Sequence, residues 1–140
     1  MGYRSAGPRA DVTEAHLETV RRMFSAEHAH DGEALAALAA DSVEFDDYTA
    51  RIRARGPAEF RRTFERSFRE IPDLAVEFLF GFANERYFFA ECQVTGHRVV
   101  DAYGGRGPLS RIRRWSIGEI TLGPRILRRR DYWDSALQRH

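Results

Sequence analysis

Apolar positions in the first third of the chain recur at the spacing of a helix. They predict a helix from residue 11 to about residue 30, with an apolar stripe formed by Leu17, Val20, Met23 and Phe24. Asp11 and Glu14 have the spacing of a capping box at its start. Asp31-Gly32 breaks the pattern and predicts the start of a second, shorter helix.

Between residues 42 and 48 the pattern changes to alternation, which predicts a short strand. Val43 and Phe45 would lie on its buried face, and Asp47 would point inward with them. Gly56-Pro57 then opens a third predicted helix, which ends at Pro72-Asp73. The buried stripe of this helix would be Phe60, Phe64, Phe68 and Ile71.

From Leu74 onward the pattern favours strands at 74–82, 86–103, 109–122 and 125–134. The connections between them are short, which predicts antiparallel hairpins. Gly96 and Gly118 lie inside the two long strands, where glycine often marks a bulge or a bend. Together these patterns predict an α+β fold: N-terminal helices packed in the concave face of a strongly bent antiparallel sheet, a cone around one pocket.

The length of 140 residues suits one domain, which we place at 11–140 after a flexible tail at 1–10. The 22 basic and 21 acidic residues nearly balance, which does not suggest binding to nucleic acid or to a membrane surface. Every basic residue is arginine, so Schiff-base catalysis by lysine is excluded. There is no signal-peptide pattern and no run of about 20 apolar residues, so we expect a cytoplasmic protein.

The composition also limits the chemistry. Five histidines show no metal-ligand spacing, and the single Cys92 excludes an internal disulfide and a cysteine metal cluster. We therefore expect neither a metal nor a cofactor. Ten Phe and two Trp are generous for this length and would make wide apolar walls, which suit an apolar small-molecule substrate.

Three segments of the chain carry a resemblance to a known family. They are the predicted helical pair from Val20 through His30-Asp31-Gly32 to Leu38, the stretch from Val43 to Asp47 with Gly56-Pro57, and the terminal run Arg130-Asp131-Tyr132-Trp133-Asp134. Over roughly residues 12–138 the chain resembles the nuclear transport factor 2-like (cystatin-like) superfamily, and within it the SnoaL-like polyketide cyclases and limonene epoxide hydrolases.

The resemblance implies an acid/base role for two aspartates. Asp131 is the first aspartate of an Arg-Asp-aromatic-X-Asp run, where the relatives carry a general acid or base. Asp47 stands nine residues before Gly56, the spacing of the general base in ketosteroid isomerases. The residues alone leave rival interpretations open, with Asp131 in a structural salt bridge to a neighbouring arginine and Asp47 in a turn. If both share one pocket, repulsion would split their pKa values and make one an acid and the other a base.

The chain also departs from these relatives. The stretch 90–94 lacks the Arg-X-Asp pair of the epoxide hydrolases. Phe24 stands where the isomerases have a tyrosine oxyanion donor, and Ser116 or Ile117 stands where some cyclases have a histidine. These departures argue against epoxide hydrolysis or isomerisation by the same sets of residues.

The sequence therefore predicts a cofactor-free acid/base enzyme of cyclase or isomerase type, acting on an apolar, polyketide-like molecule with Asp131 and Asp47 as catalytic residues. The predicted substrate contacts are Phe24, Tyr48, Gln93, Trp115 and Tyr132. The alternatives are an epoxide hydrolase or pyran-forming cyclase, and a non-catalytic domain that binds a small molecule or assists assembly. The resemblance also implies a homodimer through the outer sheet face, which the aromatic residues of strands 74–103 suit.

Overall fold

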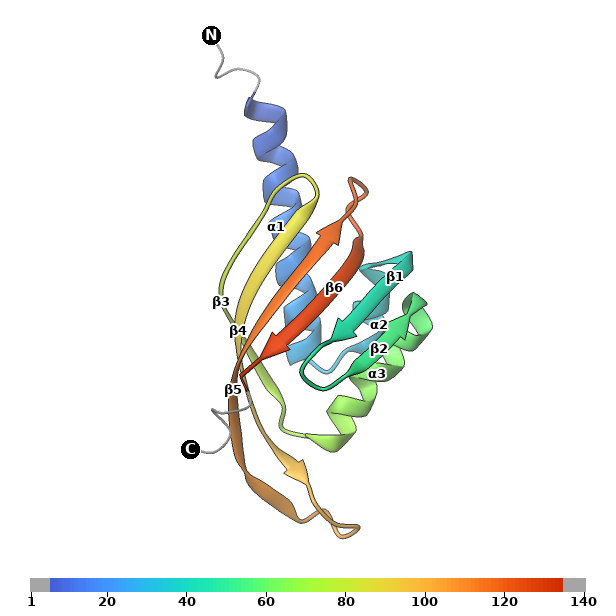
Figure 1. The fold of residues 1–140 in the computed structure, drawn as a ribbon, viewed down its shortest axis with the longest axis vertical. Helices are drawn as coiled ribbons and strands as arrows, with labels where there is room; N and C mark the ends of the chain where they lie inside the picture. The colour runs from blue at the N-terminus through green and yellow to red at the C-terminus, as the bar shows by residue number, and fades with distance from the viewer. Residues whose placement is uncertain (1–5, 135–140) are drawn as a thin grey trace.

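The computed structural model describes residues 6–134, which form three helices and six strands (Figure 1). The helices are α1 (Ala6–His28), α2 (Gly32–Ala37) and α3 (Gly56–Glu70). The strands are β1 (Ala39–Asp47), β2 (Ile52–Arg55), β3 (Ala75–Ala83), β4 (Tyr87–Val99), β5 (Arg106–Ile120) and β6 (Ile126–Trp133). The predicted α+β class is confirmed.

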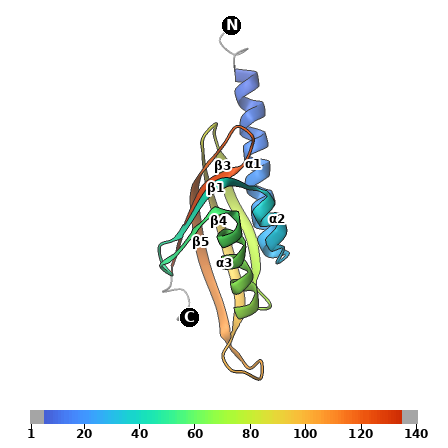
Figure 2. The same ribbon diagram turned by 90° about the vertical axis from the view of Figure 1, so that its right-hand side faces the viewer.

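All six strands belong to one sheet, in the order β2-β1-β6-β5-β4-β3. The predicted hairpins of the second half are confirmed, since β3, β4, β5 and β6 pair antiparallel with their neighbours. The sequence pattern did not predict that β1 pairs with β6, and this pairing is parallel. It also did not predict β2, which pairs antiparallel with β1. Strands β2 and β3 are the two edges, so the sheet is open. Figure 2 shows the helices gathered on one face of this sheet.

Two glycines permit the bend of the long strands, as predicted. Gly96 precedes a register shift between β4 and β5, and Gly118 precedes one between β5 and β6. A Cβ atom at Gly118 would collide with the backbone oxygen of Arg128 and with the Phe88 ring. A Cβ atom at Gly96 would collide with the side chain of Ile71, which follows α3. The absence of a side chain therefore lets β4 approach the segment that follows α3 at Gly96, and lets β5 approach its neighbours at Gly118.

Helix α1 begins earlier than predicted. It is helical from Ala6, so the helix extends into the segment 1–10 that was predicted as a tail, of which residues 1–5 lie outside the described part. Pro8 stands in the first turn, where its missing N–H removes no intrahelical hydrogen bond. Asp11 and Glu14 lie inside the helix, and the predicted capping box is wrong. None of the helices in residues 6–134 has the length and apolar composition of a membrane span.

The other helix starts follow the predicted signals. The Oδ1 atom of Asp31 accepts a hydrogen bond of 2.9 Å from the backbone N–H of Ala34, which caps α2. Pro57 stands in the first turn of α3, after Gly56 in a left-handed conformation with φ of 83°. Phe60 and Phe64 are buried against the inner face of the sheet, as their spacing predicted. Helix α3 thereby packs against β1 and β2.

Candidate active site

A cavity of about 260 Å³ lies between α3 and the inner face of the sheet. Its deepest charged residues are Glu27, Asp47, Arg114 and Asp131, which come from α1, the end of β1, β5 and β6. Phe45, Phe64 and Trp133 form an aromatic part of the wall. Hydroxyl groups of Thr63, Ser67, Ser110 and Thr95 and an ion pair between Arg98 and Glu70 contribute polar positions. The cavity therefore combines apolar walls with a few polar groups, as ligand sites usually do.

The parallel pairing of β1 and β6 brings the two predicted aspartates together. Asp47 and Asp131 are directly paired in its register, and both line the cavity. Alternation had placed Asp47 on the face of Val43 and Phe45, and both of these residues are buried. The partner strand could not be predicted, because β1 and β6 lie at opposite ends of the chain.

Asp131 is fully engaged by its neighbours. Arg129 donates from Nε to Oδ1 and from Nη2 to Oδ2, each at 2.9 Å, and Ser116 Oγ donates to Oδ1 at 2.7 Å. The side chain of Asp131 is only 2% exposed. The salt-bridge interpretation is therefore confirmed, although the bridge lies inside the fold and beside the cavity. Asp131 acts as a fixed negative charge at the cavity wall.

Asp131 belongs to a buried ion network that also includes Glu27, Arg114 and Arg129. Glu27 accepts two hydrogen bonds from Arg114, at 2.7 and 2.8 Å, and one from Arg129 at 3.1 Å. Burial by itself would raise the pKa of Glu27, but the two guanidinium groups lower it to about 2. Two acids and two bases balance one another, so the network carries no net charge.

The Arg129 side chain has no exposed surface and is enclosed by rings. Its guanidinium carbon lies 4.8 Å from the ring centres of Phe24 and Phe64 and 5.5 Å from that of Phe45. These contacts stabilise a desolvated cation through the ring faces. Phe24, predicted as a substrate contact, instead supports the buried ion network and does not line the cavity; that prediction is wrong for this cavity.

Asp47 has a different environment from Asp131. It accepts backbone N–H bonds from Thr49 at 3.0 Å and from Ala50 at 2.8 Å, so the turn interpretation is confirmed as well. The indole N–H of Trp133 lies 3.1 and 3.2 Å from its two carboxylate oxygens. Burial and, to a smaller extent, the charge of Asp131 raise the pKa of Asp47, against these hydrogen bonds. Within residues 6–134, no cationic side chain forms an ion pair with Asp47.

The other four predicted substrate contacts lie outside the cavity. Tyr48 and Tyr132 stack on each other with ring centres 5.1 Å apart, and both are exposed. Trp115 donates its indole N–H to Glu91 at 2.8 Å, beside Gln93 on the strand face opposite Cys92 and Val94. Tyr132 and Trp115 alternate with the inward-facing Asp131, Arg114 and Ser116 and point to the outer face. These predictions are wrong for this cavity, because the alternation of side chains along the strands places the residues on the outer face of the sheet.

Three residues of the site were missed at the level of sequence, and two of them had a signal. Trp133 shares the face of Asp131 by alternation. Glu27 continues the helical stripe of Val20, Met23 and Phe24, so this spacing predicts that its carboxyl group is buried, as the structure shows. Arg114 had no comparable signal, since only the sheet register brings it opposite Glu27.

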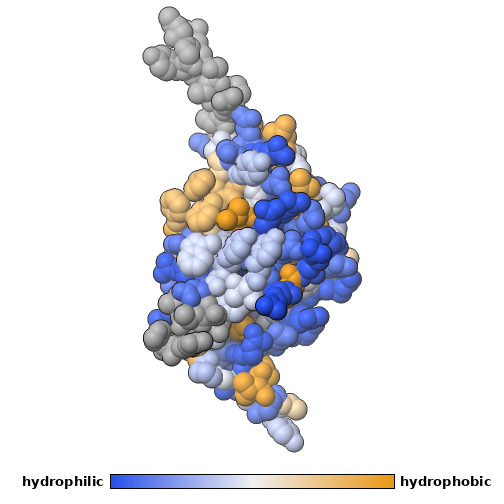
Figure 3. All heavy atoms as spheres, in the orientation of Figure 1, coloured by the Kyte–Doolittle hydropathy of each residue, from blue (hydrophilic) through white to orange (hydrophobic). Residues whose placement is uncertain are grey.

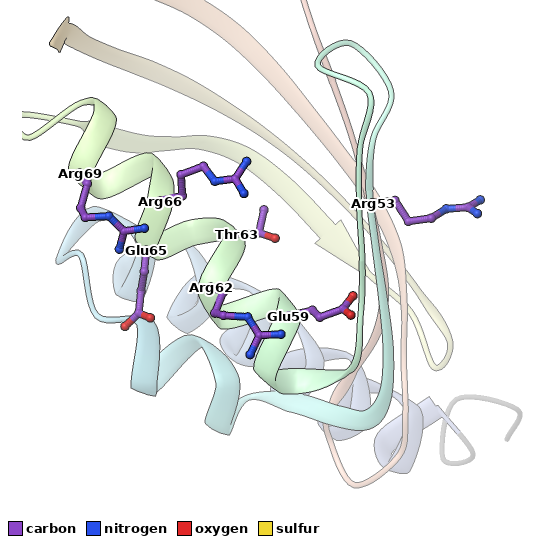
Figure 4. Close-up of a pocket in the computed structure, with 7 residues that line it drawn as sticks. All are labelled: Arg53, Glu59, Arg62, Thr63, Glu65, Arg66 and Arg69. Carbon is purple, nitrogen blue, oxygen red and sulfur yellow. The ribbon is translucent and has the colours of Figure 1, made fainter. Parts of the chain in front are cut away.

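A second hollow lies along the exposed side of α3 (Figure 4). It is lined by Arg53, Glu59, Arg62, Thr63, Glu65, Arg66 and Arg69. Figure 4 shows Arg53 on β2 and the other labelled side chains along α3, and the lining of this hollow contains no aromatic residue. This hollow has the composition of a solvated helix face, and we take the cavity inside the cone as the candidate site.

The described residues contain no group of three metal-ligating side chains that could hold an ion. Cys92 lies on the inner face of β4, and burial raises the pKa of its thiol to about 11. A thiol of this kind is a poor nucleophile at neutral pH. The chemistry of the cavity therefore falls to its carboxylates and guanidinium groups.

The fold and the cavity define a domain of the nuclear transport factor 2-like class. Residues 20–122 match the model of the SnoaL-like domain, and the chain belongs to this family. No curated protein sequence matches the chain significantly.

Solved structures share this fold at low identity. A putative SnoaL-like polyketide cyclase from Jannaschia sp. CCS1 is 12% identical, with a TM-score of 0.75 over 88% of each chain. A hypothetical protein with a ketosteroid isomerase-like fold from Catenulispora acidiphila, in complex with trimethylamine, is 16% identical, with a TM-score of 0.77 over 86% of this chain and 88% of its own. The epoxide hydrolase/cyclase-like enzyme SalBIII, of pyran ring formation in the polyether salinomycin, is 14% identical, with a TM-score of 0.72 over 88% of this chain and 93% of its own.

Proposed function

We propose that this protein is an acid/base enzyme of cyclase or isomerase type, in which Asp47 moves a proton on a small, largely apolar molecule. The observation that carries this proposal is the contrast among the cavity carboxylates. Glu27 and Asp131 belong to the buried ion network, and Glu70 pairs with Arg98, whereas Asp47 has no cationic partner among residues 6–134. A carboxylate that is partly desolvated and without a counterion is suited to take and return a proton near neutral pH.

The two aspartates therefore have unequal roles in this proposal. Asp131 remains bound to Arg129 and Ser116, and its negative charge helps to raise the pKa of Asp47. Trp133 orients the Asp47 carboxylate through its indole N–H. Asp131 is thus a positioning residue, and Asp47 is the catalytic one. The terminal Arg-Asp-aromatic-X-Asp run had favoured Asp131 as the catalytic acid or base, whereas this proposal gives that role to Asp47.

The cavity limits the substrate. Its volume of about 260 Å³ exceeds the ~150 Å³ cavity that admits benzene, so a molecule with one or two fused rings fits. The walls are partly aromatic and the network beneath them is electrically balanced. The proposed step uses the chain's own residues throughout, because Asp47 both accepts and returns the proton.

Proton exchange tests the proposal directly. Ring compounds with acidic C–H bonds are incubated with the protein in D₂O, and deuterium uptake is followed by NMR. Asp47→Asn should reduce protein-dependent exchange at least a hundredfold, the usual contribution of general base catalysis. Asp46→Asn is the matched control, because Asp46 pairs with Arg53 and Arg55 and does not line the cavity. Equal exchange by wild type and Asp47→Asn would refute the role of Asp47.

A second measurement needs no substrate. The pKa of Asp47 is followed by ¹³C NMR of its carboxyl carbon in wild type and in Asp131→Asn. Loss of the neighbouring negative charge should lower the pKa of Asp47. An unchanged or higher value would show that Asp131 does not act on Asp47 as proposed.

A second candidate function is epoxide opening, which the raised pKa of Asp47 also favours, because the protonated carboxyl can donate to an epoxide oxygen. Arg129 and Asp131 form an Arg-X-Asp pair that faces inward, although on β6 and not on a middle strand. Incubation of cyclic epoxides in D₂¹⁸O separates the two functions. Label in a diol product would support epoxide opening, and deuterium in unchanged substrate would support proton transfer. Binding of ring compounds without either reaction would support the non-catalytic alternative.

We also propose that the protein forms a homodimer through the outer face of the sheet. Figure 3 views this face and shows apolar side chains gathered over the β3 side. Phe80 and Phe82 are 56% and 57% exposed and contact each other and Phe89. Exposed aromatic clusters of this kind are typical of protein interfaces. Light scattering should give a dimer mass for wild type and a monomer mass for Phe82→Asp, and a monomeric wild type would contradict the proposal.

A further inference from the structure

Helix α3 carries a row of arginines for which the fold provides no partner. Arg62, Arg66 and Arg69 are exposed and follow one another at the spacing of a single helix face. Among residues 6–134 none of the three forms an ion pair. Glu59 is also exposed and continues the row toward the start of the helix. These four residues line the hollow of Figure 4, and we call them the α3 face.

Helix α1 carries the opposite arrangement of charge. Asp11, Glu14 and Glu18 are exposed at the spacing of one helix face, and the exposed Arg21 continues their row. These four residues line another open hollow, and we call them the α1 face. Glu18 pairs with Arg22 of its own helix, whereas Asp11 and Glu14 form no ion pair among residues 6–134. The first turns of α1 extend beyond the sheet in Figure 1, so this end of the helix is open to another molecule.

The two faces are complementary in charge when the helices run antiparallel. Both rows have intervals of three, four and three residues, at positions 11, 14, 18 and 21 and at positions 69, 66, 62 and 59. Since each residue advances a helix by about 1.5 Å, the charges of the two rows are equally spaced. The four pairs in this register are all of opposite sign: Asp11–Arg69, Glu14–Arg66, Glu18–Arg62 and Arg21–Glu59. A parallel alignment at the same spacing would instead create two pairs of like charge, Asp11–Glu59 and Arg21–Arg69.

The partner that this complementarity selects is a second copy of the chain. Within one chain no ion pair of residues 6–134 joins α1 to α3, and α2 packs against both helices. A net charge of +1 adds little repulsion between copies. Figure 2 shows the helices on one face of the sheet, so a contact between them leaves the outer face free.

We propose that the α1 face of one copy packs antiparallel along the α3 face of a second copy. Thr63 lines both the hollow on α3 and the cavity, so the helix of the second copy borders the cavity. This contact does not depend on the role of Asp47. Exposed ion pairs are individually weak, and four of them correspond to a dissociation constant of about 1 mM at low ionic strength.

The salt dependence of the mass tests the proposal on the wild-type protein. Sedimentation equilibrium is run at about 1 mM protein in about 10 mM and about 1 M salt, where the screening length falls from about 30 Å to about 3 Å. The average mass in low salt should be about 1.5-fold that in high salt. The mass in high salt is the reference, whether or not the outer sheet face forms a dimer. Equal masses would overturn the proposal and leave the α3 face to a foreign acidic protein.

Reversal of charge identifies the two faces. Arg62→Glu with Arg66→Glu reverses the α3 face, and Glu14→Arg with Glu18→Arg reverses the α1 face. Either pair of changes should abolish the increase of mass in low salt. All four changes in one chain restore both the complementarity and the wild-type net charge, so the increase should return. A fourfold variant that keeps its native circular dichroism but stays at the reference mass would overturn the proposal.

A matched control separates these faces from the effect of net charge. Arg51→Glu with Arg106→Glu changes two exposed arginines outside both faces and alters the net charge as the α3 reversal does. This control should still gain mass in low salt. A loss equal to that of the α3 reversal would overturn the proposal, because net charge alone would then explain both results.

The register is tested with a paramagnetic label. A nitroxide is attached through Asp11→Cys, since the natural Cys92 is buried, and the labelled chain is mixed with ¹⁵N-labelled wild type in low salt. The amide signals of wild type should broaden most near Arg69 and least near Glu59. Broadening that is strongest near Glu59, or that spares α3 altogether, would overturn the antiparallel contact.

Discussion

Replacing Glu27 with glutamine removes one negative charge from the buried ion network and leaves two guanidinium groups opposite Asp131. The side chain of Glu27 is 2% exposed, so water cannot compensate for the lost charge. The pKa of Glu27 falls from its ordinary value of 4.5 to about 2. At about 1.36 kcal/mol per pKa unit, this difference corresponds to about 3 kcal/mol of stability at neutral pH. Breaking a buried ion pair from one side usually costs about 3–5 kcal/mol, which agrees with this value.

Urea unfolding at pH 7, followed by circular dichroism, measures the effect. Glu27→Gln should lower the free energy of unfolding by about 3 kcal/mol, a large part of the roughly 5–15 kcal/mol of a typical domain. Glu18→Gln is the matched control: Glu18 lies on the same helix and pairs with Arg22, with exposed fractions of 56% and 66%. An exposed pair of this kind contributes less than about 1 kcal/mol. A loss in Glu27→Gln as small as in the control would refute the reasoning.

The pH dependence provides a second check on the same variant. The pKa of Glu27 is lower in the folded state, so its carboxylate stabilises the fold above pH 4.5. This contribution is lost as the pH falls from 4.5 toward about 2, where the folded protein also takes up the proton. The stability difference between wild type and Glu27→Gln should therefore narrow over this range. A difference that stays constant down to pH 2 would show that another interaction causes it.

Three further predictions follow from the site and the sheet. Asp47→Asn should raise the melting temperature at pH 7, because a carboxyl group with a raised pKa destabilises the fold when it is ionised. This gain in melting temperature should disappear as the pH falls toward 3.8, and a loss of stability at pH 7 would contradict the prediction. Trp133→Phe should move the acid limb of the activity profile to higher pH, since the indole N–H favours the ionised form of Asp47; a shift to lower pH would exclude that role. Gly118→Ala should lower the free energy of unfolding by about 1–3 kcal/mol in urea, because the new methyl group collides with the Arg128 backbone and the Phe88 ring, and an unaffected protein would show that the strand bend can relax.

The local structure of this protein could be predicted from short stretches of sequence. The stripe of Phe60 and Phe64 predicted α3, and Asp31 predicted the cap of α2. Alternation predicted that Asp47 points inward. Such features depend on residues a few positions apart, whose geometry is set by the period of a helix or a strand. The boundaries were less certain, as the early start of α1 shows.

The candidate site depended on pairings that local periodicity does not contain. Alternation assigns Tyr132 and Trp115 to the face opposite Asp131 and Arg114, but it does not say which face covers a cavity. The parallel pairing of β1 with β6 set Asp47 beside Asp131, and the β5 register placed Arg114 against Glu27 of α1. The sequence by itself therefore determined most of the elements, the fold class and the inward direction of Asp47. The tertiary structure alone decided that Arg129 neutralises Asp131 and that Asp47 has no counterion within residues 6–134, because the state of a buried charge depends on which distant groups share its desolvated environment.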